Sequence, residues 1–171
     1  MKGKNISFRA PEPADIDILY KWENDTRIWH LSNTVAPFSH HLLEEYILNA
    51  QQDIYAAKQL RLMIVETDNN KTIGCIDLFD FDPSNQRAGV GILISEEYRS
   101  KGYASQALEI LTDYAFNTLH LHQLFCNITS DNENSLKLFK KFKFEIIGLK
   151  KEWILQGKTW KDEYILQLIN K

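Results

Sequence analysis

The sequence predicts a mixed α/β (α+β) fold, with one mostly antiparallel central sheet flanked by about four helices. The 171 residues are 44% hydrophobic, which suits one domain of the usual ~100–200 residues. Strand-like apolar runs alternate with segments whose apolar residues recur at helical spacing. The sequence contains no repeat or linker, so residues 1–171 are predicted to form a single domain.

The N-terminal third predicts one strand and two helices. Ile6 and Phe8 alternate with polar residues, as in a strand, and prolines follow at positions 11 and 13. Asp15 can cap a first helix and Ser39 a second, with a polar loop expected around residues 32–34. The apolar faces of the two helices comprise Ile18, Leu19 and Trp22, and Leu42, Leu43, Tyr46 and Ile47.

The rest of the sequence, from residue 60 onward, predicts six strands and two helices. Strands are predicted over residues 60–66, 72–82 and 87–94, separated by turns at 67–71 and 83–86. A helix over 104–120 and a strand over 124–129 follow. A short helix capped by Asp131 or Asn132 precedes a closing hairpin of residues 145–155 and 160–169. The resulting order is β-α-α-β-β-β-α-β-α-β-β.

Charge and cysteine content narrow the functional classes. The formal net charge of −3 argues against general nucleic-acid binding. Acids dominate residues 15–53 and lysines dominate 135–161, either as two solvated faces or as surfaces for a cation and an anion. Cys75 and Cys126 are far apart and have no zinc-like spacing, so we expect reduced core thiols and no metal.

The sequence also predicts a cytoplasmic protein that does not enter the membrane. It has no run of the ~18 uncharged apolar residues that a membrane span needs. No apolar signal region follows the N-terminal residues 1–5.

The segment Arg99-Ser100-Lys101-Gly102-Tyr103-Ala104 is a candidate anion-binding turn, because it joins a predicted strand to a predicted helix. The first N–H groups of a helix have no internal partner and carry the positive end of the helix dipole. A tight turn at Gly102 can aim several of them at one pyrophosphate. The alternative is a solvated strand-to-helix turn.

Three features in this order resemble the GNAT superfamily of N-acetyltransferases. They are the strand 87–94 with Arg99-x-x-Gly102-x-Ala104, the strand 124–129 with Asn132-x-x-Ser135, and the helix end at Phe142-Lys143-Phe144. Residues 8–11 and 22–25 resemble the branch that holds ribosomal-protein and spermidine or diamine acetyltransferases.

The resemblance implies acetyl-CoA as co-substrate and direct attack by an amine in a ternary complex. Main-chain groups of Ile92, Leu93 and Ile94 would pair with the pantetheine arm and hold the thioester. Asn132 and Ser135 would lie along its far side. The pyrophosphate would be held by the backbone N–H groups of Arg99, Ser100, Lys101, Gly102, Tyr103, Ala104 and Ser105.

The expected partner is a small-molecule or peptide amine, and the expected assembly is a monomer or homodimer. Deprotonating a side-chain-type amine (pKa ~10.4) at pH 7 costs ~4.6 kcal/mol, whereas deprotonating an α-amine (pKa ~7.7–8.0) costs only ~1 kcal/mol. The first therefore demands a base or an apolar site. The alternatives are a non-catalytic acyl-CoA-binding module and a structural domain without a ligand.

Three positions depart from the family pattern. Phe139 stands where many relatives carry a tyrosine that protonates the leaving thiolate. Gly89 stands where spermidine-type relatives often carry a carboxylate. Lys143 replaces a glycine, so it would adopt a left-handed conformation at a cost of roughly 1–2 kcal/mol.

Asp77 is the candidate catalytic base or acceptor-binding carboxylate, because it matches an acid of spermidine-type relatives. Strand alternation predicts that Asp77, Phe79 and Phe81 share one face. A carboxylate beside two aromatic rings is poorly solvated and could accept a proton. The alternative is a carboxylate at a sheet edge in water.

Overall fold

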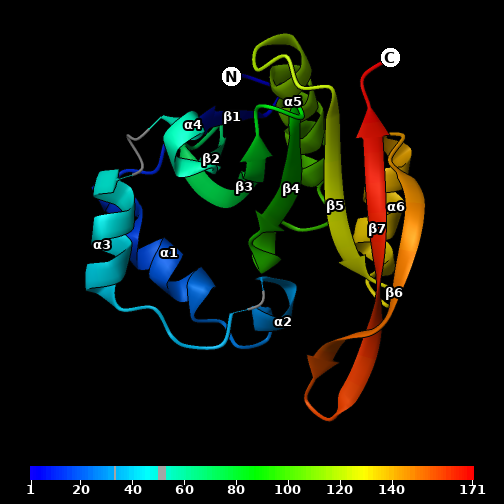
Figure 1. The fold of residues 1–171 in the computed structure, drawn as a ribbon. Coiled ribbons are helices and arrows are strands. Elements are labelled where there is room, and N and C mark those ends of the chain that lie inside the picture. The colour runs from blue at the N-terminus through cyan, green and yellow to red at the C-terminus, as the bar shows by residue number, and fades with distance from the viewer. Residues whose placement is uncertain (33, 50–52) are drawn as a thin grey trace.

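The computed structural model describes residues 1–32, 34–49 and 53–171. Seven strands in this part form one sheet in the order β1-β2-β3-β4-β5-β7-β6 (Figure 1). All neighbours are antiparallel except β4 and β5. The strands are β1 (Ile6–Arg9), β2 (Leu60–Glu66), β3 (Lys71–Asp82), β4 (Arg87–Ile94), β5 (Gln123–Thr129), β6 (Glu145–Gln156) and β7 (Thr159–Ile169).

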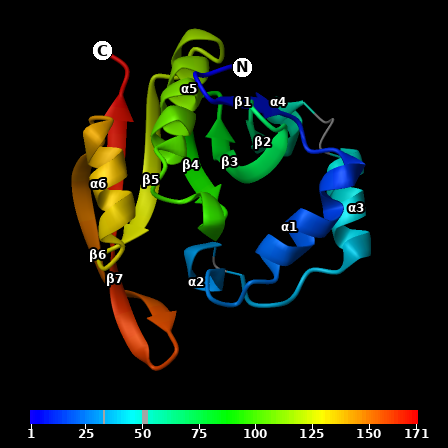
Figure 2. The ribbon, with the colours of Figure 1, turned by 180° about the vertical axis from the view of Figure 1, so that it is seen from behind.

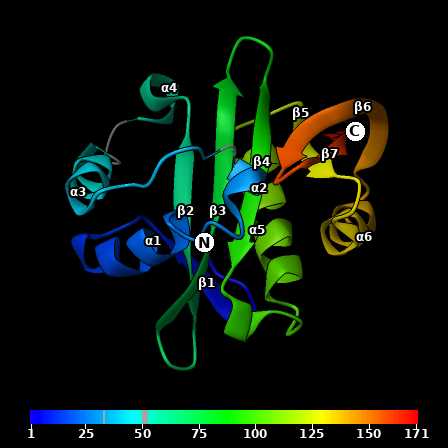
Figure 3. The same cartoon turned by 90° about the horizontal axis from the view of Figure 1, so that it is seen from below.

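Helices cover both faces of the sheet, each with its own apolar core. One core packs α5 and α6 against the sheet around Leu108, Leu124 and Phe144. The other packs α1 and α3 against Met63 and Cys75. Figures 2 and 3 show the two helix pairs on opposite sides of the strands. The described α-helices are α1 (Ile16–Glu23), α2 (Trp29–Ser32), α3 (His40–Asn49), α4 (Ile54–Ala57), α5 (Tyr103–Asn117) and α6 (Glu133–Lys141), and there are 3₁₀ turns at Pro13–Asp15 and Glu96–Tyr98.

The predicted order of strands and α-helices is confirmed, with two additional α-helices. The one-turn helices α2 and α4 were not predicted, because four residues are too few to show a helical period. α2 overlaps the loop expected at 32–34, of which residue 33 lies outside the described residues. α5 ends three residues earlier than predicted, and His120 beyond it has a left-handed φ of 54°. No helix in the described ranges is long and apolar enough to cross a membrane.

Two of the three predicted helix caps are confirmed. The Ser39 hydroxyl accepts from Leu42 N at 3.1 Å, and the Asn132 side chain accepts from Ser135 N at 3.2 Å. Asp15 is the exception, because its side chain makes no cap bond to α1. Its carboxylate instead accepts from the Arg9 guanidinium at 2.5 and 2.7 Å and from Glu12 N at 2.8 Å.

The feature that shapes the rest of the molecule is the separation of β4 from β5. The two strands pair in parallel only between residues 87–89 and 123–125. The rest of β4 keeps β3 as its neighbour, through Ile94 opposite Gly74. β5 keeps β7 as its neighbour through Thr129. The sheet is therefore open between the ends of β4 and β5 (Figure 1).

The Arg9–Asp15 pair yields a stability prediction. Burial opposes the charge of Asp15, but hydrogen bonds from Arg9 and from the Glu12 backbone lower the pKa of this carboxyl below its usual range. The pair then stabilises the fold above the ordinary pKa of ~3.9, and this contribution is lost as pH falls through the lower folded value. We expect Asp15→Asn to lower the free energy of unfolding by about 1–3 kcal/mol at pH 7.

Denaturant unfolding at pH 7 and at pH 3 measures this difference. The control is Asp17→Asn, since the Asp17 side chain is 96% exposed in the same segment. The difference between wild type and Asp15→Asn is expected to shrink at pH 3. Equal stabilities of these two proteins at pH 7 would show that the pair is not stabilising.

Candidate functional site

The open edge of β4 contributes the first part of the site. Beyond Gly89, β4 has no strand partner on the β5 side among the described residues. A strand with unpaired N–H and C=O groups is a template for another extended chain. Ile92, Leu93 and Ile94 lie on this free edge, where the sequence predicted that an extended arm would bind.

A cavity of about 440 Å³ runs from this edge to the turn before α5. The structure brings all the predicted cofactor residues to this cavity except Lys101, whose ammonium lies 4.9 Å from the centre of the Tyr98 ring. The predicted residues that line it are Ile92, Leu93, Ile94, Arg99, Ser100, Gly102, Tyr103, Ala104, Ser105, Asn132 and Ser135.

The turn before α5 is a concave group of free N–H donors. Ser100 and Gly102 both have positive φ, 63° and 82°, and the Arg99 Nε donates to the Ile94 carbonyl at 3.0 Å. None of the backbone N–H groups from Ser100 to Ser105 donates to another group of the described chain. Alternating hand in successive residues makes a nest for an anion, and the α5 dipole adds positive potential there.

Tyr103 lines the same cavity but is not a ready proton donor. Its hydroxyl donates to Glu66, and this hydrogen bond, with burial second, raises the pKa of Tyr103 to about 12. Tyr103, the first residue of α5, is nearly buried in the larger apolar core. The Tyr103 hydroxyl therefore secures the turn to the sheet.

A second, smaller cavity of about 110 Å³ adjoins the first, since Leu31, Ile92, Asn132 and Ser135 line both. Phe139 lies at this small cavity, with its ring 5.0 Å from Phe144 in an edge-to-face contact. An aromatic ring without a hydroxyl thus faces the cavity from α6.

Cys126 also lines the small cavity from β5. Burial raises the pKa of this thiol to about 12, so it stays protonated and unreactive at neutral pH. The prediction of a reduced core thiol is consistent with this environment. Cys75 is likewise free and buried, beneath α1 and α3.

The surroundings of Asp77 differ from the prediction. A bulge at Asp80, which has a φ of 48°, rotates the strand so that Phe81 joins the opposite face with Leu78. Asp77 is therefore not flanked by two aromatic rings. Both of its carboxylate oxygens accept from Arg61, at 2.8 and 2.9 Å.

Arg61 holds two carboxylates, because its third nitrogen donates to Glu23 at the end of α1. Although burial opposes the charge, Asp77 and Glu23 raise the pKa of Arg61 further above its ordinary value. Its guanidinium also lies 5.6 Å from the centre of the Tyr46 ring. The group ties α1 to β2 and β3, and it carries a net charge of about −1.

The packing of Phe79 explains why residue 89 is a glycine, where some relatives carry a carboxylate. A Cβ atom at Gly89 would lie 2.3 Å from the Phe79 ring, which also packs edge-to-face on Phe125. Gly91, two residues on, has more room, with Asp77 Oδ2 3.9 Å from a Cβ at that position. Lys143 has the predicted left-handed φ, 64°.

Several residues at the cavities escaped the sequence analysis. His30 and Leu31 come from the unpredicted helix α2, while Asn127 and Glu163 come from β5 and β7. The position of Glu163 at the cavity follows only from the pairing of β5 with β7, in which Glu163 lies opposite Thr129. The lysine-rich segment is also not one free cationic face, because Lys137, Lys150 and Lys161 pair with Glu133, Glu163 and Asp131.

Comparison with known proteins agrees with this geometry. An uncharacterized N-acetyltransferase p20 of Bacillus licheniformis is 24% identical over 169 residues, 98% of this chain and 94% of that protein. The spermidine N(1)-acetyltransferase of Vibrio cholerae is 26% identical over 168 residues, 96% of this chain and 95% of that protein. The crystal structure of a Vibrio cholerae spermidine N-acetyltransferase in complex with CoA and spermine has a TM-score of 0.87 and 21% identity, and covers 96% of this chain and 95% of that chain.

The family itself follows from the sequence model of the acetyltransferase (GNAT) domain, which matches residues 5–145. The match spans β1 to the start of β6 and includes both cavities' β4, α5 and α6 residues. The predicted fold and the predicted acetyltransferase class are confirmed. The chain belongs to the GNAT acetyltransferase family.

Proposed function

We propose that this protein transfers the acetyl group of acetyl-CoA to a primary amine of a small molecule or a protein N-terminus, by direct attack in a ternary complex. One observation carries the proposal. A single cavity joins the free edge of β4 to the free N–H groups of the turn before α5. An extended pantetheine arm needs the first and a pyrophosphate needs the second.

The proposed cofactor position places the thioester beside Ile92, where the two cavities share their lining. A main-chain N–H on the open β4 edge would stabilise the oxyanion that forms during attack. Much of the rate gain would come from holding amine and thioester together. The relative crystallised with CoA supports this position through its fold.

The leaving thiolate needs little help from a side chain. A cysteine-like thiol has a pKa of ~8.5, so the thiolate is a tolerable leaving group near neutral pH. Phe139 offers no proton, and the Tyr103 hydroxyl is already bound to Glu66. We therefore infer that water protonates the thiolate, without Phe139 or Tyr103 taking part.

Asp77 is proposed as the carboxylate that receives the amine's proton through water. Its Oδ2 approaches the Gly91 surface of β4, and Gly91 lines the small cavity. Each oxygen already accepts one hydrogen bond from Arg61, so an incoming water would use the remaining lone pairs. The Arg61 pair also fixes the carboxylate in one orientation.

An amine panel tests the proposed activity. We expect saturable release of CoA thiol from acetyl-CoA with one class of acceptor, among polyamines, aminoglycosides, amino acids and short peptides with free N-termini. The spermidine acetyltransferases among the relatives favour the polyamines. Protein that binds acetyl-CoA but releases no thiol with any acceptor would favour the non-catalytic binding module.

Gly102→Val tests the pyrophosphate turn. Because Gly102 has a left-handed φ, a β-branched residue there costs roughly 1–2 kcal/mol. Apart from the adjacent residues, no described atom lies within 4 Å of a Cβ at this position, so the valine side chain would enter the open space above the turn. We expect CoA affinity, measured by calorimetry, to fall at least about tenfold, or ~1.4 kcal/mol.

Gly157→Val is the matched control, since Gly157 also has a positive φ and open surroundings but lies in the β6–β7 turn. It should show similar strain in thermal unfolding and unchanged CoA affinity. If Gly102→Val binds CoA as tightly as Gly157→Val does, the turn does not hold the pyrophosphate.

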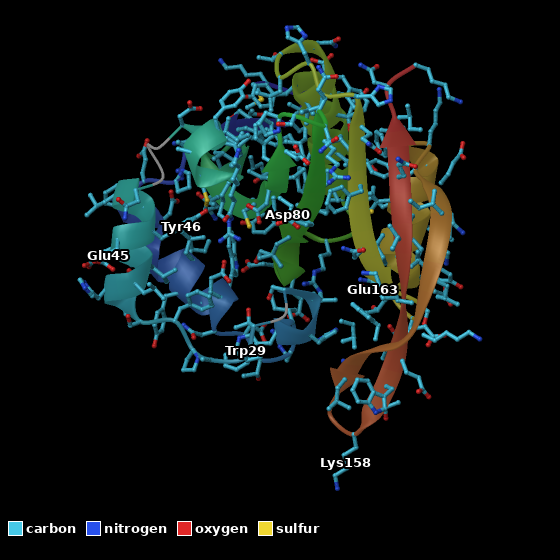
Figure 4. The ribbon with its side chains drawn as sticks, viewed as in Figure 1. Trp29, Glu45, Tyr46, Asp80, Lys158 and Glu163 are labelled. Atoms are coloured by element: carbon cyan, nitrogen blue, oxygen red, sulfur yellow. The ribbon has the colours of Figure 1, made fainter. Side chains whose placement is uncertain are left out.

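Asp77→Asn tests the proton acceptor. We expect most of the turnover to be lost while acetyl-CoA affinity is kept, because the amide accepts a proton far less readily than the carboxylate. Asp80→Asn is the control on the same strand (Figure 4). Asp80 is exposed, and asparagine tolerates its left-handed backbone. Full turnover in Asp77→Asn would remove Asp77 from the mechanism.

A further inference from the structure

Lys150 places an alkylammonium group in a site that three strands build. Its Nζ donates to Glu163 Oε2 on β7 at 2.8 Å and to Asn127 Oδ1 on β5 at 3.2 Å. The same Nζ lies 4.9 Å from the centre of the Trp153 ring on β6. A carboxylate, an amide oxygen and an aromatic face are together well suited to bind a primary ammonium.

This site borders the small cavity. Glu163 and Asn127 line it together with Gly91 and Ile92, the place proposed for the thioester. Figure 4 shows Glu163 on β7, part-way along the hairpin that ends at Lys158. The Glu163 side chain is only 11% exposed, whereas that of Lys150 is 25% exposed and can reach solvent. Lys150 can therefore leave the site without opening the core.

The carboxylate of Glu163 has unused capacity. Only Oε2 accepts a hydrogen bond from the described residues, whereas each oxygen of Asp77 accepts one from Arg61. A largely buried carboxylate is costly unless a cation or donor accompanies it. Glu163 thus requires an ammonium partner, and Lys150 supplies one from the chain itself.

A bulge in β6 gives the site its third wall. Lys150 pairs with Glu163 and Ile154 with Lys161, so three β6 residues stand opposite one β7 residue. Glu152 within this bulge has a φ of 48°. In a regular strand, residues three apart point to opposite faces. The bulge brings the Trp153 ring back to the Lys150 ammonium.

We propose that Glu163, Asn127 and Trp153 select acceptors with a second, non-reacting ammonium group, and that Lys150 occupies this position until such an acceptor displaces it. The proposal rests on the proposed amine acetylation. The attacking amine must be neutral, and a nearby carboxylate stabilises the charged form. Glu163 therefore suits the amine that does not react, and the geometry assigns it to specificity.

The test compares spermidine with n-butylamine, which lacks a second charge, at saturating acetyl-CoA. Glu163→Gln should raise the KM for spermidine about tenfold or more and leave that for butylamine unchanged, as expected for one charge-assisted hydrogen bond. Lys150→Met keeps the alkyl stem but removes the competing ammonium, so it should lower the KM for spermidine severalfold. In Glu163→Gln, adding Lys150→Met should have no further effect.

Lys151→Met is the matched control, because Lys151 is exposed on the same strand and lines neither cavity. It should leave both KM values unchanged. Thermal unfolding of each variant identifies those that fail to fold. A purely structural Lys150–Glu163 pair predicts lower unfolding temperatures with equal changes for the two amines, and that result would overturn the proposal.

Calorimetric titration of spermidine into the CoA-bound protein separates this proposal from the proposed function. If wild type acetylates neither amine but binds spermidine, and Glu163→Gln weakens that binding at least about tenfold, the ammonium site holds while the activity toward these acceptors fails. Spermidine binding that is equal in wild type, Glu163→Gln and Lys150→Met would show that the site does not recognise the acceptor.

Discussion

The separation of β4 from β5 after three residue pairs is the constraint on which the rest of this molecule depends. A sheet edge inside the protein would leave main-chain groups without partners, at a cost of about 1–3 kcal/mol for each buried group. Under the proposed function, the extended pantetheine arm of the donor supplies the missing main-chain partners at this opening. Residues 95–102 connect β4 to α5, and one cavity joins the opening to the free N–H groups of the turn before α5.

Two partly buried ion pairs flank this opening on the sheet face away from α5. Asp77 is held by Arg61 on the β3 side, and Glu163 by Lys150 on the β7 side. Between the two pairs, β4 carries Gly89 and Gly91, so no side chain of these residues covers that part of the sheet. The two pairs differ in rigidity. Arginine engages both oxygens of Asp77, whereas the flexible lysine engages one oxygen of Glu163.

The elements that local sequence determines were predictable, and the contacts across strands were not. The strands at residues 60–66 and 87–94 are apolar runs bounded by turns, and the turn at residues 99–105 carries its signal within seven residues. The Arg61–Asp77 and Lys150–Glu163 pairs depend on strand register. The bulge at Asp80, which moved Phe81 to the other face, contains no glycine to mark it.

The extra residues of the β6 bulge lie apart from β4 and the turn before α5, so the length of β6 can change in evolution without altering them. Under the proposed function, β4 and the turn before α5 must keep the shape that the acetyl donor requires, whereas no described residue of β6 or β7 lines the larger cavity. Removing the two extra β6 residues would restore regular pairing and turn Trp153 to the other face. If Glu163 and Trp153 select the acceptor as proposed, insertions in this one hairpin can change acceptor preference while the proposed donor site is left intact.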